Sequence, residues 1–141
     1  MTRALGVDLG SRRIGLAASD ASGVLASPLR VLPRAGDVAA DHAAIVDAAR
    51  EVEASTIVVG LPLSLDGRPG PAARSVLAEV DELRELARRS GVEVDTYDER
   101  FSTVTAEQGL RAAKVRRSKR RARIDAAAAT VILQSWLEAQ R

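Results

Sequence analysis

Residues 4–19 read ALGVDLGSRRIGLAAS, and this stretch decides the fold. Residues 4–9 and 14–19 are two short apolar runs, which predict two strands. The segment 10–13, Gly-Ser-Arg-Arg, has the composition and spacing of a tight turn, so the two strands are expected to form an antiparallel hairpin. One acidic residue, Asp8, interrupts the first run.

Asp8 stands inside an apolar strand, between Gly6 and Gly10. Burying a carboxylate without a partner is costly, so the protein must supply a partner or a metal ion. The flanking glycines let backbone or a ligand approach closely. Two interpretations stay open at this point, a salt bridge to an arginine and a metal-binding site.

Beyond the hairpin, the pattern alternates strands and helices. We expect a strand over 24–32, in which Pro28 marks an edge or a bend, and a helix over 38–52 that Asp37 caps. The β-branched run 56–60 is typical of a buried parallel strand. The remaining expected elements are a loop over 61–73, a helix over 76–89, a strand over 92–97, a short helix from Ser102 or Thr103 to 113, and a helix over 125–140.

This order places antiparallel strands first and strand–helix–strand crossovers after them. It predicts an α/β domain with a mixed five-stranded sheet flanked by helices on both faces, the layout of an RNase H-like fold. The chain has 141 residues, of which 46% are hydrophobic and 28% charged, as in an ordinary globular protein. We therefore expect one domain over residues 1–141.

Composition excludes several kinds of site. The chain has no cysteine, which excludes disulfides, zinc–thiolate centres and cysteine nucleophiles. Its one histidine, His42, falls between Val38 and Ile45 at helical spacing and is interpreted as a helix-border residue. Any metal must then be a hard cation held by carboxylates. No apolar run approaches the roughly 18 residues of a membrane helix and no signal peptide is visible, so a cytoplasmic protein without a membrane partner is expected.

Basic charge is concentrated in one segment. Residues 111–123, RAAKVRRSKRRAR, hold eight basic side chains and no acid, whereas acids exceed bases in the rest of the chain. Such a block is typical of a protein that binds a polyanion, although a solvated charged surface is the alternative. The residues expected to contact nucleic-acid phosphates are Arg12, Arg100, Lys114, Arg116, Arg117, Lys119, Arg120 and Arg121.

Further acids follow the later elements. Asp98 and Glu99 close the strand 92–97, and because neighbouring strand residues point to opposite faces, one of the two is expected to face a site. Arg100 suits a phosphate or carboxylate partner, so local pairing is the alternative. Asp125 stands where the last helix is expected to begin, and it could cap that helix, bind a metal, or do both.

Acids from separate elements, without cysteine or a second histidine, favour a magnesium site. Phosphoryl-transfer chemistry uses such sites, in which two ions clamp the attacking water and the leaving oxygen. A basic block beside them would neutralise the phosphate backbone. The candidate metal ligands are Asp8, Glu99 and Asp125, with Asp98 as a further candidate, and Mg²⁺ or Mn²⁺ is the expected ion.

Four motifs in order resemble the YqgF family, also called RuvX. They are LGVDLGSRRIGLAASD at 5–20, VVGLPL at 58–63 with Asp66-Gly67, DERFST at 98–103, and IDAAAA at 124–129 with Ile132-Leu133-Gln134. Each motif is weak alone, but together they span nearly the whole chain. One departure is Ser102, where the family usually has threonine, and the hydroxyl is kept.

This resemblance implies an RNase H-like fold and a Holliday junction resolvase, or a nuclease that trims the 5′ end of pre-16S rRNA. It places Asp8, Glu99 and Asp125 on the family's catalytic acids. The partners that it implies are branched DNA or precursor rRNA. The mechanism expected is in-line attack of a metal-activated water on a phosphodiester.

Two other functions compete with a nuclease. One is a non-catalytic nucleic-acid-binding module of the same fold. The other is an actin-like phosphotransferase, because residues 8–11 resemble a phosphate loop, although that fold needs two such domains. A resolvase must cut two equivalent strands, so a homodimer is expected for that role, whereas a trimming nuclease can act as a monomer.

Overall fold

The computed structural model describes residues 3–101 and 118–140, and of residues 118–125 it describes the course of the backbone. The expected hairpin, third strand and alternating helices and strands are confirmed, with ends that differ by a few residues. The short helix expected to end near residue 113 lies outside the described residues. The elements are β1 (Arg3–Leu9), β2 (Arg13–Ser19), β3 (Ala26–Pro33), α1 (Val38–Glu51), β4 (Ala54–Leu61), α2 (Pro71–Arg88), β5 (Glu93–Asp98), the 3-10 turn η1 (Glu99–Phe101) and α4 (Ser118–Ala139).

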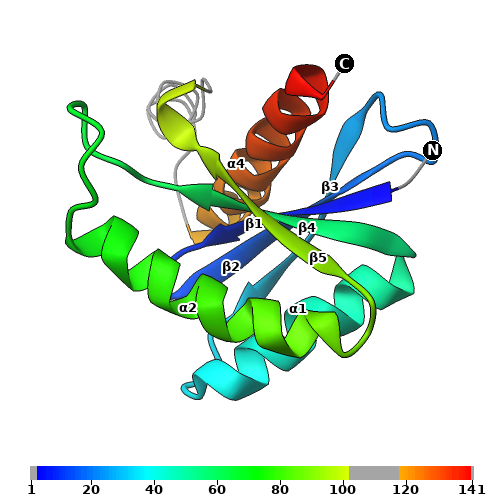
Figure 1. Ribbon diagram of the computed structural model, residues 1–141, viewed down its shortest axis with the longest axis horizontal. Helices are drawn as coiled ribbons and strands as arrows, with labels where there is room; N and C mark the ends of the chain where they lie inside the picture. Colours follow the sequence, from blue (N-terminus) through cyan, green and yellow to red (C-terminus); the bar gives the residue numbers. More distant parts are fainter. Residues whose placement is uncertain (1–2, 102–117, 141) are drawn as a thin grey trace.

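The strands form one mixed sheet in the order β3-β2-β1-β4-β5 (Figure 1). β1 pairs antiparallel with β2 and parallel with β4, which places the first strand at the centre. β4 also pairs parallel with β5. The predicted mixed five-stranded sheet is therefore confirmed. Because β1, β4 and β5 are parallel, their carboxyl ends lie at the same edge of the sheet.

Helices cover both faces of this sheet (Figure 1). On one face, Leu5 and Val7 of β1 pack with buried residues of α1 and α2 in the larger core cluster. On the other face, Ala4 packs with Ile132 and Leu133 of α4. Successive strand residues point to opposite sides, so one strand serves both cores. Within the described ranges, no helix is both long enough and apolar enough to cross a membrane.

Pro28 in β3 and Asp37 before α1 have the structural roles that the sequence predicts. β3 is an edge strand, and Pro28 lies opposite Ala17 beside a register irregularity. Proline has no N–H to give to a ladder, so an edge position with a bulge accommodates it. Asp37 caps α1, and its side chain accepts a hydrogen bond from the N–H of Ala39 at 3.1 Å.

Two helices begin earlier than the sequence pattern predicts. α2 starts at Pro71 rather than residue 76, because proline is well suited to the first helical position, where its missing N–H has no partner to lose. α4 starts at Ser118 rather than Asp125, since arginine, lysine and alanine are strong helix formers and extend the helix into the basic block. Asp125 therefore lies inside α4, and the interpretation of Asp125 as its N-cap is wrong.

Candidate active site

Asp8 lies near the end of β1, on the sheet face that α4 covers. The alternation of β1 shows this, because Ala4 belongs to the α4 core and a Cβ built on Gly6 would lie 2.7 Å from the Cβ of Leu133. Asp8 is two residues further along the same face. Its partner across the hairpin is Gly15 of β2, so no side chain stands on that neighbouring position.

Glu99 reaches the same face from the far side of β4. It opens the turn η1 directly after β5, and its Oε2 lies 3.0 Å from the position that a Cβ on Gly60 would occupy. That Cβ would also collide with Ile132 of α4. Gly60 thus leaves the space in which the Glu99 carboxylate lies against β4.

The register of the sheet brings Asp8 and Glu99 toward one another. Val7 of β1 pairs with Val59 of β4, so the next residues in the same register are Asp8 and Gly60. Neighbouring strands lie roughly 4.8 Å apart. Asp8 therefore lies between Gly15 of β2 and Gly60 of β4, and the carboxylate of Glu99 lies over Gly60. Two acids that are 91 positions apart in the sequence meet at one end of the sheet.

Glu99 is in an environment that disfavours its negative charge. Burial raises the pKa of Glu99 above its ordinary value, and the nearby charge of Asp98 raises that pKa further. A bound cation would offset both effects, because it favours the ionised form of a carboxylate. The local electrostatics therefore fit a cation-binding acid.

Carboxylate oxygens are the donors that Mg²⁺ and Mn²⁺ prefer, so Asp8 and Glu99 fit these ions in chemistry. No group of three or more potential metal ligands occurs among the residues whose side chains the structure describes. The third acid expected at the site is Asp125. The structure describes the backbone of Asp125, which lies in α4, but not its side chain. The described part thus supplies two of the expected ligands.

Asp98 is directed away from this pair. Tyr97 packs against the α4 core, so Asp98, the next residue of β5, points to the opposite face. There it accepts hydrogen bonds from Arg100, from Nε at 2.9 Å and from an Nη at 2.6 Å. These bonds lower the pKa of Asp98 below its ordinary value, against the effect of burial. This geometry agrees with the expectation that only one of Asp98 and Glu99 faces the site.

The predicted phosphate-binding residues are spread over several elements. Arg12 is exposed in the β1–β2 turn, whereas the guanidinium of Arg100 is engaged with Asp98 and with the carbonyl of Leu65 at 3.3 Å. Of the six predicted residues in the basic block, three lie in the part of α4 that the structure describes and three lie outside the described residues. The first group is Lys119, Arg120 and Arg121, and the second is Lys114, Arg116 and Arg117.

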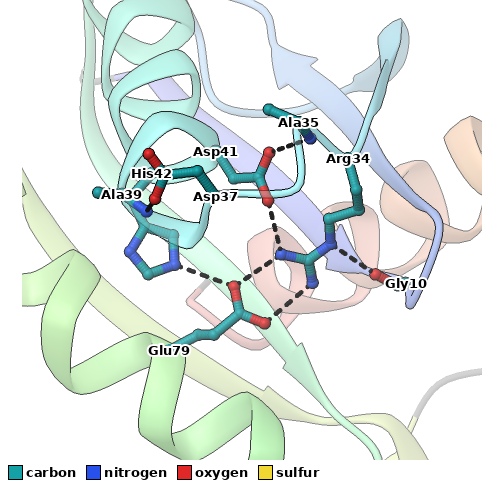
Figure 2. A network of polar contacts seen from close by, with 8 residues as sticks. All are labelled: Gly10, Arg34, Ala35, Asp37, Ala39, Asp41, His42 and Glu79. Atoms are coloured by element: carbon teal, nitrogen blue, oxygen red, sulfur yellow. Dashed lines mark hydrogen bonds and ion pairs between the residues drawn. The ribbon is translucent and has the colours of Figure 1, made fainter.

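A buried network of charges supports the turn that follows Asp8 (Figure 2). Arg34 donates to both oxygens of Glu79 at 2.9 Å and to Asp41 at 3.1 Å. Its Nε donates to the carbonyl of Gly10 at 2.9 Å, two residues after Asp8. The network therefore ties α1, α2 and the end of β3 to the β1–β2 turn.

His42 completes this network, with Nε2 at 2.9 Å from Glu79, and its side chain is only 3% exposed. The interpretation of His42 as a helix-border residue is therefore wrong. Sequence reasoning missed the network, although Asp41 and His42 occupy inward positions between Val38 and Ile45. Two polar residues on an apolar stripe are a signal for buried partners.

Gly60→Ala tests whether this glycine keeps Glu99 in place. The added methyl group must displace Glu99 and Ile132, so we expect a loss of about 1–3 kcal/mol in the free energy of unfolding. We also expect a loss of up to about 100-fold in cleavage rate, because misplacing a reacting group by about 1 Å has an effect of that size. Urea unfolding and single-turnover cleavage measure the two effects.

Gly70→Ala is the matched control, because a Cβ at Gly70 meets no atom within 4 Å and its φ is −77°. This variant should keep the wild-type cleavage rate. Equal cleavage by Gly60→Ala and wild type would contradict the placement of Glu99 in the active site.

Comparisons of sequence place the chain among known proteins. The family model described as "RuvX: Holliday junction resolvase" matches residues 2–139. A protein of Streptomyces avermitilis, named "Putative pre-16S rRNA nuclease", is 46% identical over 139 residues, which cover 99% of this chain and 87% of the relative. A protein of the same name from Kineococcus radiotolerans is 48% identical over 137 residues, which cover 97% of this chain and 72% of the relative.

Solved structures resemble the chain in fold. Thermus thermophilus RuvC in complex with a Holliday junction substrate has a TM-score of 0.61 at 18% identity, and the match covers 99% of this chain and 96% of RuvC. A second structure of Thermus thermophilus RuvC has a TM-score of 0.58 at 16% identity, and the match covers 98% of this chain and 95% of that RuvC chain. This likeness confirms the predicted RNase H-like fold. The family match over nearly the whole chain, with relatives of this identity, shows that the chain belongs to the RuvX family.

Proposed function

We propose that this chain is a metal-dependent nuclease that cleaves phosphodiester bonds of structured nucleic acid in the cytoplasm. The observation that carries the proposal is the convergence of Asp8 and Glu99 beside Gly60, at the edge of the sheet where β1 and β4 end. Membership of a family of nucleases and resolvases supports the same activity. Gly60 leaves the space that the Glu99 carboxylate occupies, and Gly15 places no side chain opposite Asp8.

Asp8, Glu99 and Asp125 are the proposed ligands of Mg²⁺ or Mn²⁺. Asp125 lies seven residues, or about two helical turns, before Ile132, the α4 residue that packs at Gly60. When bound, the ions would lower the pKa of an attacking water and stabilise charge on the phosphate. The three carboxylates would hold the ions and thereby position the attacking water and the phosphate. Asp98 is a weaker candidate ligand, because its oxygens accept hydrogen bonds from Arg100.

The substrate is proposed to be precursor rRNA or branched DNA, the two classes that appear in the names of the relatives and of the RuvC complex. Arg12 and the basic residues 111–123 would hold the phosphate backbone. Arg100 could contact a phosphate only by sharing its ion pair with Asp98. Incubation with Mg²⁺ or Mn²⁺ and labelled four-way junctions, duplexes and pre-16S rRNA tests the activity. Binding without cleavage of any of these would favour a non-catalytic module.

The basic block gives a prediction about salt. Replacing Arg116, Arg117, Arg120 and Arg121 by alanine should weaken binding to all nucleic-acid sequences equally. The slope of log affinity against log salt should become shallower by about 0.7–0.9 for each phosphate that the variant no longer neutralises, because fewer counterions are released. Binding titrations at several salt concentrations measure this slope. An unchanged slope would mean that these side chains form only a solvated surface.

Assembly separates the two substrate classes. Cutting two equivalent strands of a junction requires two active sites related by a two-fold axis, and this chain supplies one. If junctions are the substrate, light scattering should show a homodimer on junction DNA. A strict monomer with and without junction DNA, together with cleavage of precursor rRNA, would reject the resolvase role and keep the nuclease.

A further inference from the structure

Two large apolar side chains are exposed to solvent at the edge of the sheet that carries the proposed active site. Among the large hydrophobic residues that the structure describes, Leu65 and Phe101 are the most exposed, at 95% and 70%. Leu65 lies in the loop after β4, and Phe101 ends η1, so both follow the strand ends that carry the site. Phe101 is two residues from Glu99, a span of at most about 7 Å along the chain.

Arg100 contacts both the Phe101 ring and the backbone of Leu65. Its guanidinium lies over the Phe101 ring, 5.4 Å from the centroid, which is within the range of a cation–π contact. One Nη donates to the carbonyl of Leu65 at 3.3 Å, and Asp98 fixes the same guanidinium. The loop approaches closely because Gly67 has φ +84° and a Cβ there would lie 3.2 Å from Arg100. The exposed ring is therefore part of an ordered arrangement.

The chemistry of the ring indicates what would cover it. A phenyl ring has a flat apolar face and no hydrogen-bonding group, so it can stack on any base without reading its identity. A nucleic acid whose phosphate lies at Asp8 and Glu99 would have its flanking nucleotides along the edge of the sheet to which Phe101 belongs. Bases in a duplex are already stacked on their neighbours, so only an unpaired base offers a free face.

We propose that Phe101 stacks on one unpaired base next to the phosphodiester that is cut. This inference rests on the proposed nuclease function and deepens it, because it names the feature of the substrate that is recognised. A base at the branch of a junction and a base in a single-stranded 5′ extension both have this feature. Recognition of an unpaired base selects structure over sequence.

A binding cycle with abasic probes tests the proposal. The probes are an RNA stem with a single-stranded 5′ extension and a DNA four-way junction with unpaired bases at its branch. Each is made intact and with an abasic site at every unpaired position in turn. Affinities are measured in EDTA, so that a metal-dependent enzyme does not cut the probe. The proteins are wild type, Phe101→Ala, Phe101→Trp and Leu25→Ala. Leu25→Ala is the matched control, because Leu25 is a hydrophobic residue distant from Phe101 in the sequence and is 62% exposed.

Phe101→Ala should weaken binding to at least one intact probe by about 5- to 150-fold, the size of one base–aromatic stack. Phe101→Trp should keep the wild-type affinity, because indole also stacks, and Leu25→Ala should change nothing. At one position an abasic site should weaken the wild type by the same factor and leave Phe101→Ala unaffected. Such non-additivity shows that the base and the ring interact directly.

Other outcomes overturn the proposal. If wild type and Phe101→Ala bind every intact probe equally, no base stacks on this ring. If Phe101→Ala loses the same factor on intact and on all abasic probes, the ring acts on the backbone or on the protein itself. In both cases the nuclease function stands. If the wild type binds no probe, the proposed nuclease function fails and the stacking proposal fails with it.

Discussion

The Asp8→Asn variant is expected to cleave at least about 1,000-fold more slowly than the wild type in Mg²⁺. A neutral amide is a poor ligand for a hard cation. The metal is worth several kcal/mol of charge stabilisation in the transition state, and each 1.36 kcal/mol changes a rate tenfold. Folding and nucleic-acid binding should stay close to wild type. Single-turnover cleavage with excess enzyme, together with thermal unfolding of both proteins, measures these properties.

Asp81→Asn is the control for this experiment, because Asp81 is an acid on α2 whose side chain is 82% exposed. It removes the same charge far from the site in sequence and should cleave like the wild type. Wild-type cleavage by Asp8→Asn would contradict the metal role. An Asp8→Asn protein that does not fold would instead support the interpretation of Asp8 as a structural ion-pair partner.

The Arg34→Met variant is expected to lose about 3 kcal/mol in the free energy of unfolding. Asp41 and Glu79 would then face one another without their shared cation, in a site where both side chains are less than 15% exposed. Removing one member of a buried ion pair costs about 3–5 kcal/mol. Urea unfolding measures the change. Because Arg34 also binds the carbonyl of Gly10, amide exchange in the β1–β2 turn should become faster.

Arg30→Met is the matched control, since it breaks the ion pair between Arg30 and Glu51, whose side chains are 41% and 56% exposed. An exposed pair contributes at most about 1 kcal/mol. If Arg34→Met destabilises the protein no more than Arg30→Met does, the network does not support the fold.

The same network predicts how stability depends on pH. Burial by itself raises the pKa of Glu79, but the hydrogen bonds from Arg34 and His42 outweigh burial and hold that pKa below its ordinary 4.5. A lowered pKa in the folded state stabilises the protein above the unfolded pKa. That stability is lost as the pH falls through the lower, folded value. Glu79→Gln should flatten the fall in stability below about pH 4.5, and an unchanged fall would contradict this origin.

Local patterns are sufficient to predict the sheet and the two described acids. The apolar run around Asp8, the β-branched run before Gly60 and the turn residues after Leu9 each carry a local physical preference that the tertiary structure keeps. The acids can be proposed because a charge in an apolar strand needs an explanation. Their meeting at Gly60 cannot be predicted, since it depends on the register between β1 and β4.

The errors arise where a residue's role depends on distant partners. His42 is buried because Glu79, 37 positions away, accepts its hydrogen bond, and no local pattern shows that pairing. Arg34 is likewise 45 positions from Glu79. The sequence pattern places both helix starts too late, because proline and a dense basic run are ordinarily loop signals. In the structure, Pro71 begins α2, and α4 includes residues 118–123 of the basic block.

Locating Mn²⁺ in crystals by its anomalous scattering tests the central claim most directly, because it requires neither a substrate nor a cleavage assay. The claim is that Asp8 and Glu99 together hold the catalytic metal. We predict an anomalous peak within roughly 2.0–2.2 Å of a carboxylate oxygen of both residues, beside Gly60, and its loss in Asp8→Asn crystals. A Mn²⁺ ion bound elsewhere, or at Asp98 without Asp8 and Glu99, would contradict the account.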